Sequence, residues 1–237
     1  MRLLLARHGE SLWNAERRFQ GSSDIALSPR GRAQAEALGR GLHGYRVRAA
    51  YVSPFRRARE TAELALRGTD VPLVVMEELR ELSLGTWEGC TVDEVRAQDG
   101  DPYVAWVRAP HDCPPPGGEP LPVVSERVRA ALDRIAAAHP DRDDVLVVAH
   151  GGVISVYACH LLGCSLNRLW RLRVDNASLT IVKPPRLTDG RAKGRWTAGK
   201  AVRIGMLSSI TRQDLAAFLL AEALMPQHVA QAVFIRG

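Results

Sequence analysis

Short aliphatic runs alternate with helical patterns along most of the chain. Four runs, each bounded by polar residues, glycine or proline, are typical of strands buried on both faces of a sheet. They cover residues 2–6, 49–53, 72–77 and 144–149. Apolar positions at helical spacing predict helices over residues 28–42, 56–67 and 125–139. Strands that alternate with helices predict a mainly parallel sheet covered on both sides, which is a three-layer α/β/α fold.

The pattern changes near residue 182. Paired prolines, two glycines and clustered cations over residues 182–196 follow a further strand predicted at 177–182. Beyond this break we expect one helical face over residues 211–223 and a short strand at 231–235. The chain is therefore expected to contain an α/β domain, residues 1–182, and a small α/β appendage, residues 183–237.

The net charge of +6 lies entirely in the appendage. Residues 1–182 hold 23 Arg, no Lys and 23 acidic residues, whereas residues 183–237 hold nine cations and three acids. The nine cations are scattered without interleaved aromatic residues, so they predict a solvated surface and no nucleic-acid partner.

Hydropathy predicts no membrane partner. The sequence has no run of about 18 apolar residues, and its first ten residues are too soon interrupted by charge for a signal peptide. We therefore expect a cytoplasmic protein. The four cysteines have neither C-x-x-C spacing nor a histidine at zinc-finger distance, so free thiols and no metal site are expected.

Two of the predicted strands end in the same way, with a histidine followed by glycine. Arg7, His8 and Gly9 follow the first strand, and His150 and Gly151 follow the strand at 144–149. The carboxyl ends of parallel strands meet at one edge of a sheet, where ligands bind, and glycine lets a ligand approach the backbone closely. We therefore expect both histidines in one shared site, where each can act as nucleophile, base or ligand.

Three arginines, Arg56, Arg57 and Arg59, begin the helix predicted at 56–67. Cations at a helix N-terminus oppose the helix dipole, so at least one of them is expected to face an anion. The other two are better explained as charges on the exposed helix face.

Four segments carry a family resemblance. The segments "RHGESLWN", "SPFRRARETA", "LRELSLGTWEG" and "VAHGG", in this order, resemble the histidine phosphatase superfamily, which includes cofactor-dependent phosphoglycerate mutases and many small phosphatases. The resemblance covers residues 2 to about 182 and implies a three-layer α/β domain with a phosphohistidine mechanism. By position, it implies that His8 is the nucleophile and that Glu81 protonates the leaving oxygen. Its implied phosphate-binding residues are Arg7, Asn14, Arg57, His150 and Gly151.

Phosphoryl transfer chemistry agrees with these roles. It needs an in-line nucleophile and positive charge around the equatorial oxygens, so a neutral His8 attacks while Arg7, Arg57 and a protonated His150 hold the charge. Glu81 can give a proton to the leaving oxygen and later activate water, which requires it to be partly protonated near neutral pH. No metal and no other cofactor is required. The expected partner is a small phosphorylated substrate.

Some acidic and polar residues have two interpretations. Glu81 could be a surface carboxylate, like its neighbours Glu77 and Glu78, although its position before "LSLGTWEG" favours the catalytic role. Ser23 could touch substrate, as the corresponding loop does in the family. Glu119 fits a Gly-Gly-Glu pattern of phosphatases and equally fits an acid before a helix.

The appendage carries a second resemblance. Its "PPRLTDG" run and "ITRQDLAAFLL" segment resemble the C-terminal end of NAD(P)H-binding atypical short-chain reductases. Those proteins bind the dinucleotide through an N-terminal glycine-rich βαβ unit, which does not occur here, so no cofactor is inferred. The appendage could pack on the phosphatase domain, cover the substrate site or join two copies into a homo-oligomer.

Three alternatives to a phosphatase stay open at this point. A phosphoglycerate mutase must exclude water, and the 35 residues from 90 to 124, including a proline-rich loop expected at 111–122, look short for such an enclosure. A non-catalytic phosphate-binding or interaction module would be expected to lack one of the matched residues, and none is missing. An NAD(P)H reductase lacks its nucleotide site.

Overall fold

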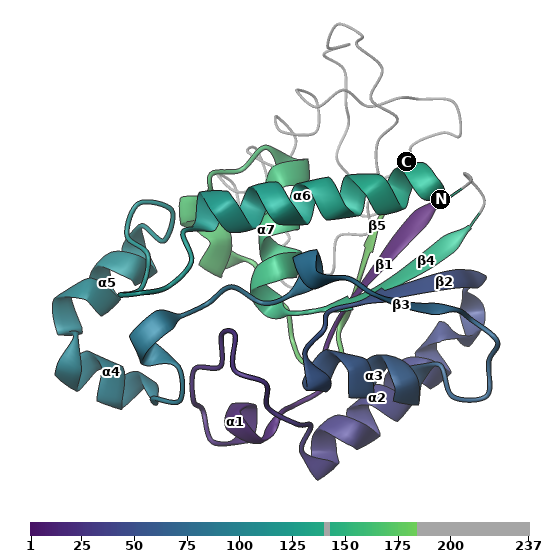
Figure 1. The fold of residues 1–237 in the computed structure, drawn as a ribbon, viewed down its shortest axis with the longest axis horizontal. Coiled ribbons are helices and arrows are strands. Elements are labelled where there is room, and N and C mark those ends of the chain that lie inside the picture. Colours follow the sequence, from purple (N-terminus) through teal and green to yellow (C-terminus); the bar gives the residue numbers. More distant parts are fainter. Residues whose placement is uncertain (140–142, 184–237) are drawn as a thin grey trace, which may run out of the picture.

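A five-stranded sheet forms the centre of the computed structural model, which describes residues 1–139 and 143–183 (Figure 1). The strand order is β3-β2-β4-β1-β5. The strands are β1 (Arg2–Arg7), β2 (Val47–Val52), β3 (Leu73–Val75), β4 (Asp144–Ala149) and β5 (Leu179–Val182). The first four run parallel, and β5 lies antiparallel to β1 at one edge. The predicted, mainly parallel sheet is confirmed.

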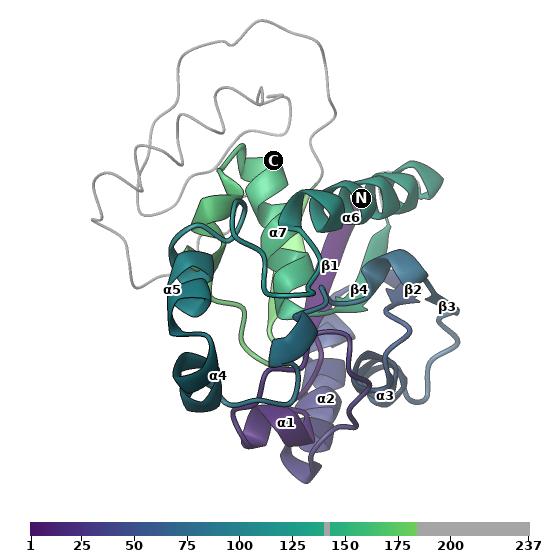
Figure 2. The same ribbon diagram turned by 60° about the vertical axis from the view of Figure 1, so that its left-hand side comes forward.

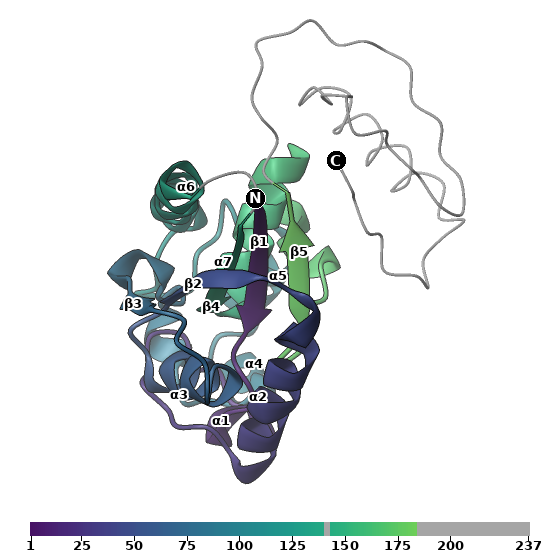
Figure 3. The ribbon, with the colours of Figure 1, turned by 90° about the vertical axis from the view of Figure 1, so that its right-hand side faces the viewer.

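Helices cover both faces of this sheet. Helices α6 (Leu121–Ala138) and α7 (Gly151–Leu162) lie on one face, and α2 (Pro29–Gly41) and α3 (Arg56–Ala65) lie on the other (Figure 3). Strand β1 serves both layers, because Leu3 and Leu5 belong to the core under α6 and α7 while Leu4 belongs to the core under α2 and α3. The predicted three-layer α/β/α fold is confirmed.

Two predicted helix starts can be compared with the structure. Helix α2 begins as expected, since the Ser28 side chain accepts a hydrogen bond from the Gly31 N–H and Pro29 occupies the first turn. Helix α6 begins at Leu121, before the predicted start at residue 125, because Pro122 lies in its first turn rather than in a loop. Proline fits this position because its missing N–H would have no partner there.

The segment between the third strand and α6 contains two helices that the hydrophobic pattern did not predict. These are α4 (Val92–Gln98) and α5 (Gly100–Arg108), which lie side by side away from the sheet (Figure 2). Thr91 starts α4 through a capping box, in which its side chain accepts from the Glu94 N–H. Helix α5 brings Trp106 to a ring-centroid distance of 5.4 Å from Trp87. Residues 90 to 124 are therefore not a plain loop.

Shorter elements complete the described chain. They are α1 (Leu12–Ala15) and four 3-10 turns at Leu42–Gly44, Glu77–Leu79, Gly85–Trp87 and Leu166–Arg171. One prediction is wrong in part: β3 is not buried on both faces, since Val74 and Val75 are 45% and 51% exposed. Strand β3 is the outermost strand of the sheet and has a neighbour on only one side.

Two further predictions concern the appendage and membranes. The helix and strand expected beyond residue 183, and the reductase resemblance there, lie outside the described residues. Within residues 1–139 and 143–183, no helix is both long and apolar enough to cross a membrane.

Candidate active site

The sheet register brings the two predicted histidines together. Arg7 on β1 is paired with Ala149 on β4, and the His8 N–H donates to the Ala149 carbonyl at 3.0 Å. The next residue on each chain segment is therefore a histidine, and the ring centroids of His8 and His150 lie 5.1 Å apart. Both side chains are buried. This geometry agrees with the shared site expected from the repeated strand-His-Gly pattern.

The ring of His8 has a defined proton position. Its Nδ1 lies 2.7 Å from the carbonyl oxygen of Gly9. A carbonyl can only accept, so Nδ1 carries the hydrogen and Nε2 of the neutral ring carries the lone pair. Burial, followed by the guanidinium groups of Arg57 and Arg7, holds the pKa of His8 well below its usual value. At neutral pH the ring is therefore uncharged, the form required of a nucleophile.

The ring of His150 is held in the opposite way. Its Nε2 lies 2.7 Å from the hydroxyl oxygen of Ser53, which follows strand β2. That hydroxyl accepts a long hydrogen bond from the Phe55 N–H, at 3.4 Å, so its own proton is directed at Nε2 of His150. The ring hydrogen then resides on Nδ1, a buried atom that has no hydrogen-bond partner among the described residues.

The charge of His150 differs from the sequence-based expectation. Burial lowers the pKa of His150 well below its usual value, and the charges of Arg57, His8 and Arg7 lower it further. The protein's own groups therefore leave this ring neutral, and the expected protonated His150 is corrected to a neutral ring that donates through Nδ1–H.

Arg57 in the first turn of α3 is the arginine directed into the protein. It is 1% exposed, and its Nη1 and Nη2 donate to the carbonyls of Ser23 and Gly21 at 2.6 and 2.8 Å. Burial lowers the pKa of Arg57 to about 10, so the side chain stays a cation at neutral pH. Arg56 is exposed and pairs with Glu60 on the same helix at 2.6 Å. The distinction drawn between these two arginines agrees with the geometry.

Arg7 approaches the site from β1. Its Nη1 donates to the carbonyl of Val174 at 2.7 Å, whereas its Nε is buried without a partner among the described residues. A Cβ atom at Gly151 would lie 3.5 Å from this Nε, so the glycine keeps the guanidinium edge uncovered. The Nε of Arg57 is likewise buried without a described partner. Together with Nδ1 of His150, three buried N–H donors from three elements lack a partner, which is the donor set of an anion site.

Glu81 belongs to the same site. Its carboxylate accepts hydrogen bonds from the N–H groups of Leu82 and Gly152 at 3.0 and 3.1 Å, and it interacts electrostatically with Arg7 and Arg57. A Cβ atom at Gly152 would come within 2.5 Å of Glu81 Oε1, so only glycine allows this approach. The position of Glu81 beside the first turn of α7 argues against the surface-carboxylate interpretation.

Asn14 lies beside the catalytic loop rather than among its charged groups. It is half-buried in α1, where it forms a capping box with Ser11. Its Oδ1 accepts from the Ser11 N–H and from Nδ2 of Asn176, at 3.2 and 3.1 Å. The same Asn176 Nδ2 lies 3.2 Å from the carbonyl of His8, and this connects Asn14 to the loop.

Glu88 is a residue that the sequence interpretation missed. Its carboxylate accepts from the hydroxyls of Ser22 and Ser23 at 2.8 and 2.7 Å, and from the Leu84 N–H at 2.9 Å. It thereby holds the loop whose carbonyls bind Arg57. The "TWEG" motif contains this glutamate and was the available signal. Ser23 contacts Arg57 through its carbonyl, a role that its side chain does not reveal in the sequence.

Arg127 on α6 is a second missed residue. It pairs with Glu119 at 2.8 Å and donates to the carbonyls of Glu78 and Arg80 at 2.9 and 2.8 Å. Glu119 precedes α6 and serves this ion pair, which favours its interpretation as an acid before a helix. The cluster supports the chain immediately before Glu81.

Comparisons with known proteins agree with this geometry. The family model described as Histidine phosphatase superfamily (branch 1) matches residues 3–192. Phosphoserine phosphatase 1 of Hydrogenobacter thermophilus is 33% identical over 182 residues, which are 77% of this chain and 86% of the relative. The probable phosphoglycerate mutase of Erwinia tasmaniensis is 34% identical over 182 residues, which are 77% of this chain and 84% of the relative.

Solved structures show the same likeness. A mycobacterial glucosyl-3-phosphoglycerate phosphatase, solved in complex with VO3, is 32% identical and has a TM-score of 0.72. The match covers 77% of this chain and 92% of that structure. The likeness therefore extends over most of each protein.

Proposed function

Since the chain belongs to the histidine phosphatase superfamily, we propose that it hydrolyses a small phosphorylated metabolite through a phosphohistidine formed at His8. The chain is a phosphoric monoester hydrolase, as its phosphatase relatives are. The finer assignment, of one role to each residue, is argued from the hydrogen bonds and charges of the described site.

One observation supports this proposal most directly. Three buried N–H donors, Arg7 Nε, Arg57 Nε and His150 Nδ1, lack a protein partner, and they surround a neutral His8 whose Nε2 carries a lone pair. Leaving buried donors unpaired costs free energy, so such groups in a native protein call for an explanation. A phosphoryl group supplies the acceptor oxygens for all three donors, and its phosphorus atom supplies the target for Nε2.

The first step transfers the phosphoryl group to the enzyme. His8 Nε2 attacks phosphorus in line with the ester oxygen, so a P–N bond forms while the P–O ester bond breaks. Glu81, in its protonated form, gives its proton to the departing oxygen, and an alcohol leaves. Arg7, Arg57 and the Nδ1–H of His150 stabilise the negative charge on the equatorial oxygens.

The second step returns the enzyme to its starting form. Water attacks the phosphorus atom, and the Glu81 carboxylate accepts one of its protons. The P–N bond breaks, its electron pair returns to His8 Nε2, and inorganic phosphate is released. The net reaction consumes one ester and one water and yields one alcohol and one phosphate.

Paired variants of neighbouring arginines test the site. With p-nitrophenyl phosphate as substrate, Arg57→Ala should lower kcat/KM by about 10²-fold to 10³-fold, the range for loss of one transition-state donor. Arg56→Ala is the matched control, because the exposed Arg56 precedes Arg57 in the same helical turn, and its kcat/KM should stay within about twofold. Equal losses in the two variants would contradict the proposed phosphate site.

A phosphoglycerate mutase is the second candidate, because one relative at 34% identity carries that name. A mutase returns the phosphoryl group to bound substrate, whereas a phosphatase gives it to water. Incubation with 3-phosphoglycerate should release inorganic phosphate with little isomerisation. Rapid isomerisation with negligible phosphate release would overturn the phosphatase assignment in favour of the mutase.

Three finer predictions accompany the proposal. A cytoplasmic location, self-association and a role of the appendage in covering the substrate site remain predictions. Assays of a panel of phosphorylated metabolites with the full chain, and with a chain ending at residue 182, address the third. A change in substrate preference on truncation would support it, and identical preferences would contradict it.

A further inference from the structure

We propose that Asn176 is a positioning residue for the phosphate site, which orients the side-chain amide of Asn14 toward the phosphoryl group. The inference rests on the proposed function, because it assumes that the loop containing His8 receives phosphate. Asn176 follows the last 3-10 turn and precedes β5, so it lies 162 positions from Asn14 in the chain. None of the segments that carry the family resemblance contains it.

Two backbone groups determine the orientation of both amides. The His8 carbonyl can only accept, so the Asn176 atom 3.2 Å from it is the nitrogen Nδ2. The Ser11 N–H can only donate, so the Asn14 atom 3.2 Å from it is the oxygen Oδ1. The remaining contact, Asn176 Nδ2 to Asn14 Oδ1 at 3.1 Å, then pairs a donor with an acceptor. The three hydrogen bonds are mutually consistent, and flipping either amide would break at least one of them.

This arrangement leaves one group of Asn14 free for a ligand. Its Oδ1 accepts two hydrogen bonds, and its Nδ2 has no partner among the described residues. An amide NH2 is a donor, and a phosphoryl oxygen is an acceptor, so Nδ2 is the end of Asn14 that suits phosphate. Without Asn176, the amide of Asn14 would be held by the Ser11 N–H alone.

The chain around Asn176 is itself held against the catalytic loop. The Val174 carbonyl accepts from Arg7 Nη1, and the Ala177 N–H donates to the carbonyls of Arg7 and His8, both at 3.1 Å. Ala177 has a φ of 54°, a left-handed conformation that costs free energy for a residue other than glycine. Its N–H contacts offset that cost, so this segment has a defined position beside the loop.

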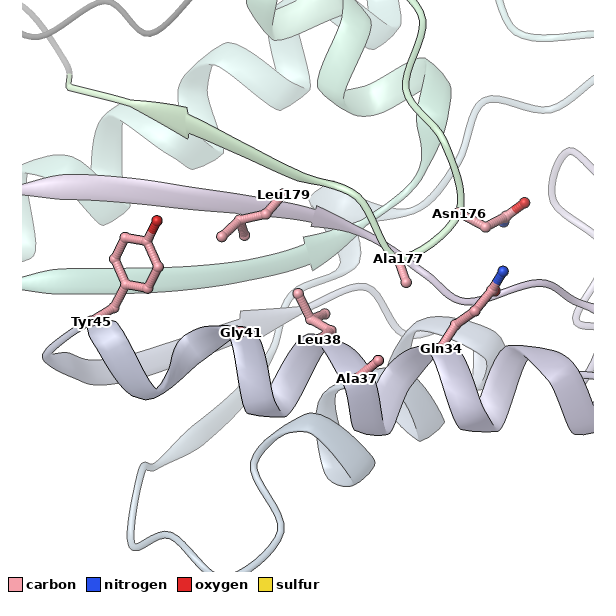
Figure 4. A pocket seen from close by; sticks show the side chains of 8 residues that line it. All are labelled: Gln34, Ala37, Leu38, Gly41, Tyr45, Asn176, Ala177 and Leu179. Atoms are coloured by element: carbon pink, nitrogen blue, oxygen red, sulfur yellow. The ribbon is translucent and has the colours of Figure 1, made fainter. Parts of the chain in front are cut away.

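A groove behind this segment explains why truncation of Asn176 should be tolerated. The groove has a volume of about 430 Å³ and is lined by α2 and by residues 176–179, with Gln34 and Asn176 at the same end (Figure 4). Gln34 accepts from the Glu10 N–H at 2.8 Å, so both amides support the loop backbone after β1. Replacing Asn176 by a smaller residue enlarges an open groove and creates no closed cavity in the core.

A double-mutant cycle tests the proposal with orthovanadate as the probe. Asn14→Ala and Asn176→Ala should each raise the inhibition constant for orthovanadate about tenfold, the effect of losing one hydrogen bond to a charged group. If Asn176 acts through Asn14, the double variant should lose little more than Asn14→Ala alone. Asn176→Asp, which keeps the shape and removes the donor, should weaken inhibition at least as much as Asn176→Ala.

Asn167→Ala is the matched control. Asn167 also fixes its amide by two contacts, to the His111 N–H and to Asp112, but on the protein surface. Its inhibition constant should not change, and thermal unfolding of every variant verifies folding. Multiplicative losses in the double variant, or no change in Asn176→Ala, would overturn the proposal. Failure of the unaltered protein to bind orthovanadate or to release phosphate would instead overturn the proposed function.

Discussion

His8 and His150 occupy matching places in the fold and have opposite hydrogen-bonding patterns. Each follows a buried parallel strand, each is followed by glycine, and each ring is neutral because burial and the same arginines lower its pKa. In His8, Nδ1 donates to the Gly9 carbonyl and the remaining nitrogen carries a lone pair. In His150, Nε2 accepts from Ser53 and the remaining nitrogen carries a hydrogen.

This difference separates a nucleophile from a donor. Phosphorus is an electrophile and requires a lone pair, whereas the equatorial oxygens are acceptors and require N–H groups. One strand end therefore supplies attack and the other supplies charge stabilisation, although their sequences look alike. The partner of the second ring nitrogen, rather than the strand-His-Gly pattern, assigns the role.

The same substitution at both histidines should give the largest contrast. His8→Gln removes the nucleophile and should lower kcat with p-nitrophenyl phosphate by at least about 10⁴-fold, as loss of a covalent catalytic residue does in other enzymes. His150→Gln keeps an N–H donor and should cost only about 10²-fold. Steady-state kinetics on folded variants measure both. Equal losses at the two positions would refute the division of roles.

The glycines after the two histidines should differ in their effect on stability. A Cβ atom at Gly9 would overlap the carbonyl oxygen of Gly31, which is backbone and cannot move easily, so Gly9→Ala should lower the free energy of unfolding by about 1–3 kcal/mol. A Cβ atom at Gly151 would meet nothing closer than 3.5 Å. Gly151→Ala should therefore change the free energy of unfolding by less than about 1 kcal/mol. Urea denaturation of both variants provides the comparison, and a larger loss in Gly151→Ala would contradict it.

Removing the Ser53 hydroxyl should affect only His150. Ser53→Ala leaves Nε2 without its donor, so the ring can move its hydrogen to Nε2, and kcat should fall about tenfold, as expected for loss of one hydrogen bond to a charged group. Nitrogen NMR of the histidine rings should show the Nδ1–H form of His150 in the unaltered protein and a shift toward the Nε2–H form in the variant. An Nε2–H form of His150 in the unaltered protein would show that the assignment is wrong.

Acid should destabilise the folded protein through both histidines. Their folded-state pKa values lie below the usual 6.5, so between the two values the unfolded chain binds more protons than the folded one. The free energy of unfolding should therefore fall as the pH drops below about 6.5, by up to about 1.4 kcal/mol per pH unit for each histidine. Denaturation between pH 7 and 5 measures this slope. The slope should decrease in His150→Gln, and an unchanged slope would exclude His150 as its source.

The sequence allowed the prediction of the sheet and of the residues at its carboxyl edge. Buried parallel strands have a strong aliphatic signal, and their register alone brings His8 and His150 together once both strands are recognised. Arg57 could be chosen over Arg56 only with the family resemblance, because their local sequence environment is the same. Helices α4 and α5 were missed because they are short and owe their position to tertiary contacts such as those of Trp106.

The ring states and the supporting residues could not be predicted in this way. The role of Ser53 depends on a hydrogen bond to a residue 97 positions away, and that of Asn176 on contacts 162 and 168 positions away. Periodicity reports which face of an element is buried, not which polar groups of distant segments meet. The expected charge on His150 was wrong because the desolvation of a fully buried ring is not visible in a sequence.

Trapping the phosphorylated enzyme tests the central claim most directly. The full chain is mixed with p-nitrophenyl phosphate, quenched in alkali, where phosphohistidine survives, and digested for mass spectrometry. The account predicts one added phosphoryl group on the peptide that contains His8 and none on that peptide from His8→Gln. A phosphoryl group on the His150 peptide, or sustained turnover by His8→Gln, would contradict it.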